Sequence, residues 1–130
     1  LYNFLSITEI NTASITTNSP IEKIYLTNVK KLILNDSYKL KELTFDSNMR
    51  SLSLFRSNSS FLNNLKSDTL DELSINACTF NKNFKISQNF PKLKYLQLDF
   101  STFDNNFNIE NLYGNYNFLS LNYLYRFLME

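Results

Sequence analysis

The stretch LDELSINACTF at residues 70–80 is echoed by LKYLQLDFSTF at residues 93–103. When each stretch is extended by four residues, six of fifteen positions are identical. Repetition at a fixed period is typical of solenoids and other repeat architectures, in which each repeat is one supersecondary unit that buries its apolar face only against a neighbour. These two stretches therefore predict a stacked repeat fold, provided that further copies exist.

Further copies of the pattern L-x-x-L-x-L, where L is Leu, Ile, Val, Met or Phe, occur along the chain. The fourth and sixth positions alternate with mostly polar ones, and this period of two predicts a short, half-buried strand. The first position is expected to enter the same core. The copies lie at 21–26, 29–34, 40–45, 49–54, 70–75 and 93–98, with a degenerate copy, LNYLYR, beginning at residue 121.

The copies fall into two interleaved sets. The main set begins at residues 29, 49, 70, 93 and 121, and a second set begins at residues 21 and 40. In later turns weaker apolar segments fill the second slot, at 63–65, 83–86 and 107–112. The pattern predicts a coil with two walls and a filled interior, in which each turn has one strong strand and one weaker segment returning on the opposite side.

The ninth position of the main set is occupied by small polar side chains or a thiol: Ser37, Ser57, Cys78 and Ser101. Such a residue suits an inward-facing corner, where its side chain bonds the backbone of the turn. The same column predicts that Cys78 is a buried, inert residue and not a reactive thiol.

The chain resembles the leucine-rich repeat superfamily over roughly residues 21–130. The segment LDELSINAC (70–78) matches the consensus L-x-x-L-x-L-x-x-N/C in every fixed position, and three other copies match it with Ser at the last position. The resemblance implies an α/β-type solenoid of mostly β content: a leucine-rich-repeat horseshoe segment with a parallel concave sheet and short strands or irregular turns on the convex side. Long convex helices are not expected, because 57–69 and 81–92 are rich in Asn and Ser. The structural rival is an unrelated two-sheet β-solenoid.

We expect one repeat domain over residues 1–130, with 1–20 as a degenerate or capping repeat and 21–130 as the leucine-rich repeats. The chain starts at Leu1 without Met and ends in an apolar run, YLYRFLME. We therefore expect it to be a piece of a longer protein, and the remainder of its own chain to be one of its partners.

Composition argues against most catalytic and nucleic-acid functions. The 130 residues carry a net charge of +1, so no strong field attracts nucleic acid or an anionic membrane. No apolar run approaches the roughly 18 residues of a membrane span. With no His, one Cys and one Gly, the chain holds no Ser-His-Asp triad, no zinc site of the usual ligands and no Gly-rich phosphate loop. We predict a non-enzymatic protein without cofactor or metal, and an intracellular location is slightly favoured over an extracellular one.

The resemblance also implies which side chains face a partner. In leucine-rich repeat geometry, positions three, five and seven of each copy point outward from the concave sheet, and large aromatic side chains there are the kind that carry binding energy. The alternative is that the terminal aromatics only cover the sheet edge or pack under a neighbour. The candidate partner-binding residues are Lys31, Ile33, Ser53, Phe55, Glu72, Ser74, Tyr95, Gln97, Asp99, Tyr123 and Tyr125.

Three functions remain open on this reasoning. The first is a protein–protein interaction scaffold, such as the substrate-binding part of an F-box-type adaptor, although no F-box sequence is visible. The second is a surface or secreted adhesion and ligand-recognition protein, which sugars on the sequons at Asn35 and Asn58 would favour. The third is a structural solenoid that packs only within a larger chain.

Overall fold

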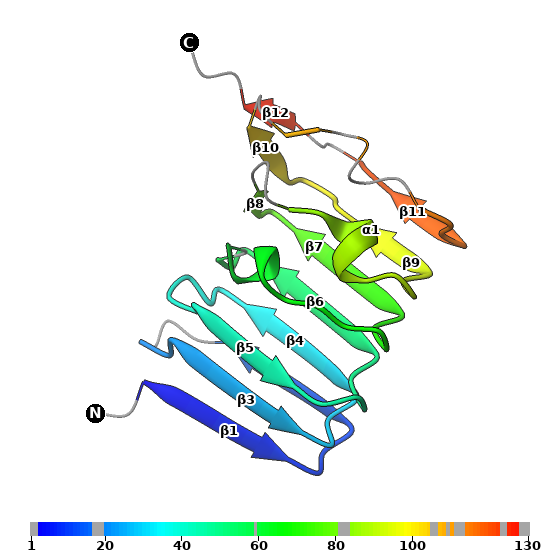
Figure 1. Cartoon of the computed structure of the whole chain (residues 1–130). Helices are drawn as coiled ribbons and strands as arrows, with labels where there is room; N and C mark the ends of the chain where they lie inside the picture. Colours follow the sequence, from blue (N-terminus) through cyan, green and yellow to red (C-terminus); the bar gives the residue numbers. More distant parts are fainter. Residues whose placement is uncertain are drawn as a thin grey trace.

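A computed structural model of the chain describes residues 3–16, 20–58, 60–80, 84–104, 107–108, 110, 114–122 and 125–127. These residues form a β-solenoid of about five turns, and every strand pair is parallel. Figure 1 shows the turns stacked on one another from the N-terminal to the C-terminal end. The prediction of a repeat solenoid that is mostly parallel β-sheet is confirmed.

The main wall is a six-stranded sheet built from the main set of copies. Its register keeps equivalent positions side by side, so that Leu52 lies opposite Leu32 on one side and Leu73 on the other. In spatial order its strands are β11 (Phe118–Ser120), β9 (Tyr95–Gln97), β7 (Glu72–Asn76), β6 (Ser51–Phe55), β4 (Lys31–Asn35) and β2 (Thr12–Thr16).

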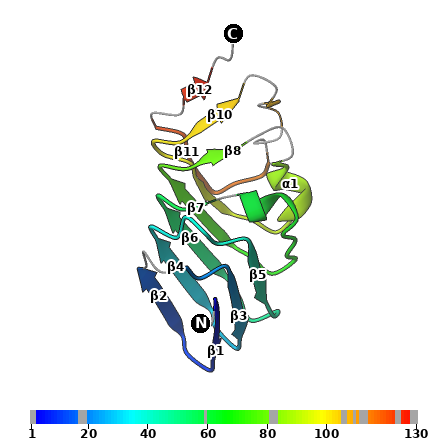
Figure 2. The same cartoon turned by 90° about the vertical axis from the view of Figure 1, so that its left-hand side faces the viewer.

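The second wall changes its structure along the solenoid. Its first half is a three-stranded sheet of β1 (Phe4–Thr8), β3 (Lys23–Thr27) and β5 (Glu42–Phe45). In later turns the described segments are a 3-10 helix, η1 (Ser60–Asn63), and a single helical turn, α1 (Ile86–Asn89). Figure 2 shows these segments on the side away from β4, β6 and β7. We predicted short strands or irregular turns for this wall, without long helices. Each of the two described helices is four residues long, in agreement with that prediction.

A third, smaller sheet follows the corners of the last turns. It contains β8 (Thr79–Phe80), β10 (Thr102–Asp104) and β12 (Tyr125–Phe127). Below it lies a cluster of four rings, with centroids 5.0 to 5.9 Å apart in the contacting pairs, which fills the wider interior of these longer turns. The rings are those of Phe80, Phe84, Phe103 and Phe107.

The six-stranded sheet contributes three inward columns to the core, as the sequence pattern predicts, and they pack against buried residues of the second wall such as Ile24 and Leu62. Leu32, Leu52, Leu73 and Leu96 in the fourth position are fully buried. The first and sixth positions of the same four turns are buried as well: Val29, Met49, Leu70 and Leu93, then Leu34, Leu54, Ile75 and Leu98. Because each turn contacts only its neighbours, the stability of the stack depends on these turn-to-turn contacts.

The ninth-position side chains bond the backbone of their own turn, as predicted: Ser57 Oγ donates to the Phe55 carbonyl (3.0 Å), and Ser101 Oγ donates to the Asp99 carbonyl (3.3 Å). They also accept hydrogen bonds between neighbouring turns, and we call this column the corner ladder. The backbone N–H of Ser37 donates to Ser57 Oγ (3.0 Å), and that of Cys78 donates to Ser101 Oγ (3.3 Å). Between them, the Cys78 thiol donates to the Asn76 carbonyl of its own turn (3.3 Å). Burial raises the pKa of this thiol, so Cys78 is a neutral corner residue.

The eighth position adopts the left-handed conformation in every described turn of the main set from β4 to β9, although none of these residues is Gly. The φ angles of Asp36, Arg56, Ala77 and Phe100 lie between 46° and 56°. Each of these residues donates its N–H to a carbonyl of the next turn, as Ala77 does to Asp99 (3.1 Å). The left-handed residue therefore turns the chain out of the strand and at the same time joins neighbouring turns.

The last turn has a different register from the one predicted. Leu119 pairs with Leu96, so the final copy of the main set is YNFLSL, which begins at Tyr116. The proposed copy at residue 121 is wrong, because Tyr125 lies in β12 and pairs with Thr102 of the third sheet. Each segment matches the pattern in all but one apolar position, with Tyr116 at the first position of one and Arg126 at the sixth of the other, and the pairing with β9 selects the earlier segment.

The N-terminal segment continues both walls. β1 pairs with β3 over five residues, and β2 pairs with β4 over five residues. Leu5 and Ile7 of β1 lie opposite the buried Ile24 and Leu26, and Ala13 of β2 is buried opposite Leu32, whereas Phe4 is 48 % exposed.

Candidate functional site

The candidate site is the outer face of the six-stranded sheet, which we define as the side chains at positions three, five and seven of the main-set copies. The parallel register arranges them in three rows that run along the solenoid. The row of third positions is Thr12, Lys31, Ser51, Glu72, Tyr95 and Phe118. The row of fifth positions is Ser14, Ile33, Ser53, Ser74, Gln97 and Ser120.

A polar network occupies the C-terminal half of the outer face. Gln97 is its centre: its Oε1 accepts hydrogen bonds from Ser74 Oγ (3.1 Å) and Tyr95 OH (3.3 Å), and its Nε2 donates to Asp99 Oδ2 (2.6 Å). Asn76 Nδ2 donates to Ser74 Oγ (3.0 Å) and extends the network to the edge of β7. The side chains of three neighbouring turns are thus fixed relative to one another.

An aromatic pair lies next to this network. The rings of Tyr95 and Phe118 are stacked, with centroids 4.4 Å apart and planes 6° apart. Phe118 remains 45 % exposed. A second aromatic position is Phe55, which is also exposed and has the guanidinium of Arg56 at 4.9 Å from its ring centroid. The outer face therefore presents apolar rings that the fold itself does not cover.

Asp99 differs from its predicted role as a partner-binding residue. Its side chain is buried, and its carboxylate accepts hydrogen bonds from Gln97, from Ser120 Oγ (2.7 Å) and from the backbone N–H of Asn122 (2.9 Å). β9 ends at Gln97, so the chain has already begun to turn when it reaches Asp99. This carboxylate joins the last two turns of the sheet and is not free for a partner.

Protonation of Asp99 is expected to weaken the C-terminal turn. Burial raises the pKa of this carboxyl, but the hydrogen bonds from Gln97, Ser120 and Asn122 outweigh burial and lower the pKa below its ordinary value. A lowered folded-state pKa contributes stability above the unfolded-state pKa of about 3.9, and this stability is lost as the pH falls through the folded-state value. We expect the difference in unfolding free energy between the wild type and Asp99→Asn to be largest near neutral pH and to shrink below about pH 4. Urea denaturation of both proteins across this pH range would measure it, and two parallel pH profiles would contradict the assignment.

Eight of the predicted site residues lie on the outer face. Lys31, Ile33, Ser53, Phe55, Glu72, Ser74, Tyr95 and Gln97 all belong to strands of the six-stranded sheet, in the predicted rows. Tyr123 lies outside the described residues. Tyr125 belongs to β12 of the third sheet, so the prediction that placed it on the outer face is wrong.

Sequence reasoning missed members of the site at both ends of the sheet. Thr12 and Ser14 of β2 precede the copy at residue 29, with which the predicted main set began. Phe118 and Ser120 complete the rows next to Tyr95 and Gln97, and the wrong register for the last turn hid them. The spacing itself was a signal, because a copy at residue 116 continues the step of 23 residues between the copies at 70 and 93, whereas the copy at 121 requires a step of 28.

The outer face is polar and aromatic in character. The chain contains no His, and within the described ranges no three residues among Cys, Asp and Glu come together as metal ligands. No helix in the described part of the chain has the length and apolar character needed to cross a membrane. What the face offers is hydroxyl, amide and aromatic groups on a rigid parallel sheet.

Comparison of the chain with protein-family models, with curated proteins and with solved structures gave no match in any of the three.

Proposed function

We propose that this chain is a non-catalytic recognition solenoid, which binds a protein partner on the outer face of its six-stranded sheet in the manner of a leucine-rich-repeat scaffold. The observation that carries the proposal is the exposed aromatic pair of Tyr95 and Phe118 beside the network centred on Gln97. Stacking and the hydrogen bond from its hydroxyl hold Tyr95 in one orientation before any partner arrives. Prior ordering of an aromatic anchor reduces the entropy cost of binding.

The chemical composition of the outer face supports protein recognition. Tyr, Ser and Asn are the residues that antibody combining sites use most, because the aromatic ring supplies contact area and the small polar groups supply adaptable hydrogen bonds. The same residue types occur here in Tyr95, Ser53, Ser74 and Asn76. The face carries few charges, as Lys31 and Glu72 are its charged members apart from the buried Asp99. This composition suits a protein surface better than a nucleic acid.

Two more specific roles fit the proposal. The first is a substrate-binding part of an F-box-type adaptor, and the second is a surface or secreted recognition protein. One contact disfavours the second role at one sequon: Asn58 Nδ2 already donates to the Leu40 carbonyl (2.9 Å), and a sugar on this nitrogen would disturb that bond. The third function, packing within a larger chain, would place another segment of the same protein on the outer face.

Capture of a partner from an extract of the source cells, followed by titration of the purified partner, tests the proposal. We expect the double variant Tyr95→Ala/Gln97→Ala to bind the partner at least tenfold more weakly than the wild type, which corresponds to about 1.4 kcal/mol. The matched control is Tyr25→Ala/Thr44→Ala, which also removes an aromatic and a polar side chain, but from the paired strands β3 and β5 of the second wall.

The outcomes separate the alternatives. Loss of binding in the first variant alone, with both variants folded by circular dichroism, supports the outer face as the binding surface. Equal binding by both variants, or equal loss in both, contradicts it. If the wild type retains no protein but binds a purified segment of its own longer chain, the packing function is correct.

A further inference from the structure

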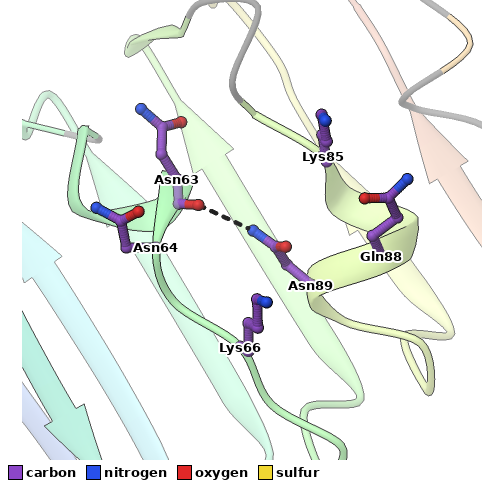
Figure 3. Close-up of a pocket in the computed structure, with 6 residues that line it drawn as sticks. All are labelled: Asn63, Asn64, Lys66, Lys85, Gln88 and Asn89. Atoms are coloured by element: carbon purple, nitrogen blue, oxygen red, sulfur yellow. Dashed lines mark hydrogen bonds between the residues drawn. The ribbon is translucent and has the colours of Figure 1, made fainter.

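A polar hollow lies between the two short helices, on the wall opposite the outer face. Asn63, Asn64 and Lys66 line one side of it, and Lys85, Gln88 and Asn89 line the other (Figure 3). Its volume is about 610 Å³, within the range of roughly 300–1,000 Å³ that is typical of small-molecule sites. Because β5 is the last strand of the second wall before these helices, the hollow forms where this wall changes from strands to helical turns.

Asn89 fixes the floor of the hollow. It is 6 % exposed, and its Nδ2 donates to the carbonyl oxygens of Leu62 (3.3 Å) and Asn63 (3.4 Å) in the preceding turn. The Asn89 carbonyl accepts the backbone N–H of Ser67 (2.9 Å), so the two walls of the hollow are joined at two places. Its Oδ1 accepts no hydrogen bond from any described residue, and this oxygen belongs to a side chain that is more than nine-tenths buried. The hollow therefore contains an acceptor that no described residue uses.

The other lining groups are mainly hydrogen-bond donors and positive charges. None of the six lining residues is acidic, and two are lysines from different turns. In the described part of the chain, neither Lys66 nor Lys85 forms a salt bridge. The amides of Asn63, Asn64 and Gln88 add donors and acceptors around the two ammonium groups. No aromatic ring lines the hollow, so it has nothing on which a nucleobase could stack.

We propose that this hollow binds an acidic saccharide, with its sulfate and carboxylate groups on Lys66 and Lys85, one on each side, and its hydroxyl groups on the surrounding amides. The two lysines supply the charge that attracts an oxyanion. Oδ1 of Asn89 accepts a hydrogen bond from a hydroxyl, which inorganic sulfate at neutral pH lacks. Because most small-molecule sites are lined chiefly by apolar side chains, a wholly polar lining favours a ligand that is rich in hydroxyl groups.

Titration of the ¹⁵N-labelled protein with a sulfated uronic-acid disaccharide, followed by NMR, tests the proposal. We expect saturable shifts of the side-chain amide signals of Asn63, Asn64, Gln88 and Asn89. The variant Lys66→Gln/Lys85→Gln is expected to raise the dissociation constant at least tenfold. Both lysines are exposed and neither is in a salt bridge, so this variant is expected to fold.

The control variant is Lys30→Gln/Lys39→Gln, which makes the same change in net charge at two exposed lysines outside the hollow. Unchanged binding by the control, with weaker binding by the first variant, supports the site. Equal weakening in both variants would show attraction to net charge alone and would overturn it. If inorganic sulfate causes the same shifts with the same affinity, the hollow is a simple anion site and the saccharide proposal is overturned. The absence of saturable shifts would overturn the proposal as a whole.

Discussion

Leu73→Ala is expected to reduce the free energy of unfolding by about 3–5 kcal/mol, close to the upper end of the range for buried leucines. Leu73 is fully buried in β7, near the middle of the stack, with Leu52 of one turn and Leu96 of the next on either side. The substitution removes contacts with both neighbours and leaves a cavity that a closely packed interior fills only in part. Urea denaturation followed by circular dichroism would measure the change.

The matched control for this substitution lies in the same column. Leu119 of β11 pairs with Leu96 but is 46 % exposed. Because much of this side chain is already in contact with water, Leu119→Ala is expected to cost less than about 1.5 kcal/mol. Similar losses of stability at Leu73 and Leu119 would contradict the conclusion that the middle turns are buried and the last turn is partly exposed.

Ala77→Pro is the second substitution with a large expected effect, of about 3 kcal/mol or more. Proline locks φ near −65°, whereas Ala77 has φ 56°. Proline also has no N–H, and the N–H of Ala77 donates to the Asp99 carbonyl (3.1 Å). The substitution therefore removes a bond between turns and displaces the corner that precedes the ladder residue Cys78. Thermal and urea unfolding are expected to show the loss, together with weaker coupling between β7 and β9.

Ala77→Gly is the matched counterpart and is expected to act in the opposite direction. A left-handed conformation costs a non-Gly residue about 1–2 kcal/mol, and glycine avoids this cost but loses more backbone entropy on folding. The net expectation is a gain of about 0.5 kcal/mol. A loss of stability in Ala77→Gly would contradict the left-handed assignment, since the N–H remains in both proteins.

The inward columns and the corner ladder were predictable from the sequence because each depends on a short period. Leu73 and Ile75 are two residues apart in one strand, so both enter the core once the strand is recognised. The column from Ser37 to Ser101 was visible because its members are small polar side chains or a thiol, and the hydrogen bonds of these side chains to the carbonyls of their own turns confirm the predicted role.

Other features depend on contacts between turns that the sequence does not display. Ala and Phe disfavour positive φ, so nothing in Ala77 or Phe100 signalled the left-handed corner, which the bonds to the next turn impose. Two overlapping segments matched the pattern in part in the last turn; the spacing favours the copy at residue 116, and the pairing with β9 establishes it. The burial of Asp99 follows from the early end of β9.

The hollow between the helices was also hidden from sequence reasoning. Its two sides come from turns whose members, Asn63 and Asn89, are 26 residues apart. In a chain rich in Asn and Lys, individual residues of these types give no local signal. We predicted weaker apolar segments in the second wall, and two of them lie at the hollow. The prediction did not indicate that the two helical turns face each other.

The unequal length of the turns has a consequence for how this architecture accepts change. Successive partners in the row of third positions are separated by 19, 20, 21, 23 and 23 residues, yet the strands of the six-stranded sheet stay in register. The added residues are absorbed by the second wall, which changes from strands to helical turns as the turns lengthen. Insertions and deletions in that wall can therefore accumulate without shifting the outer face. One side of the molecule is free to diversify in length while the other keeps a fixed grid of side chains, and new loops could be grafted at η1 and α1 on the same principle.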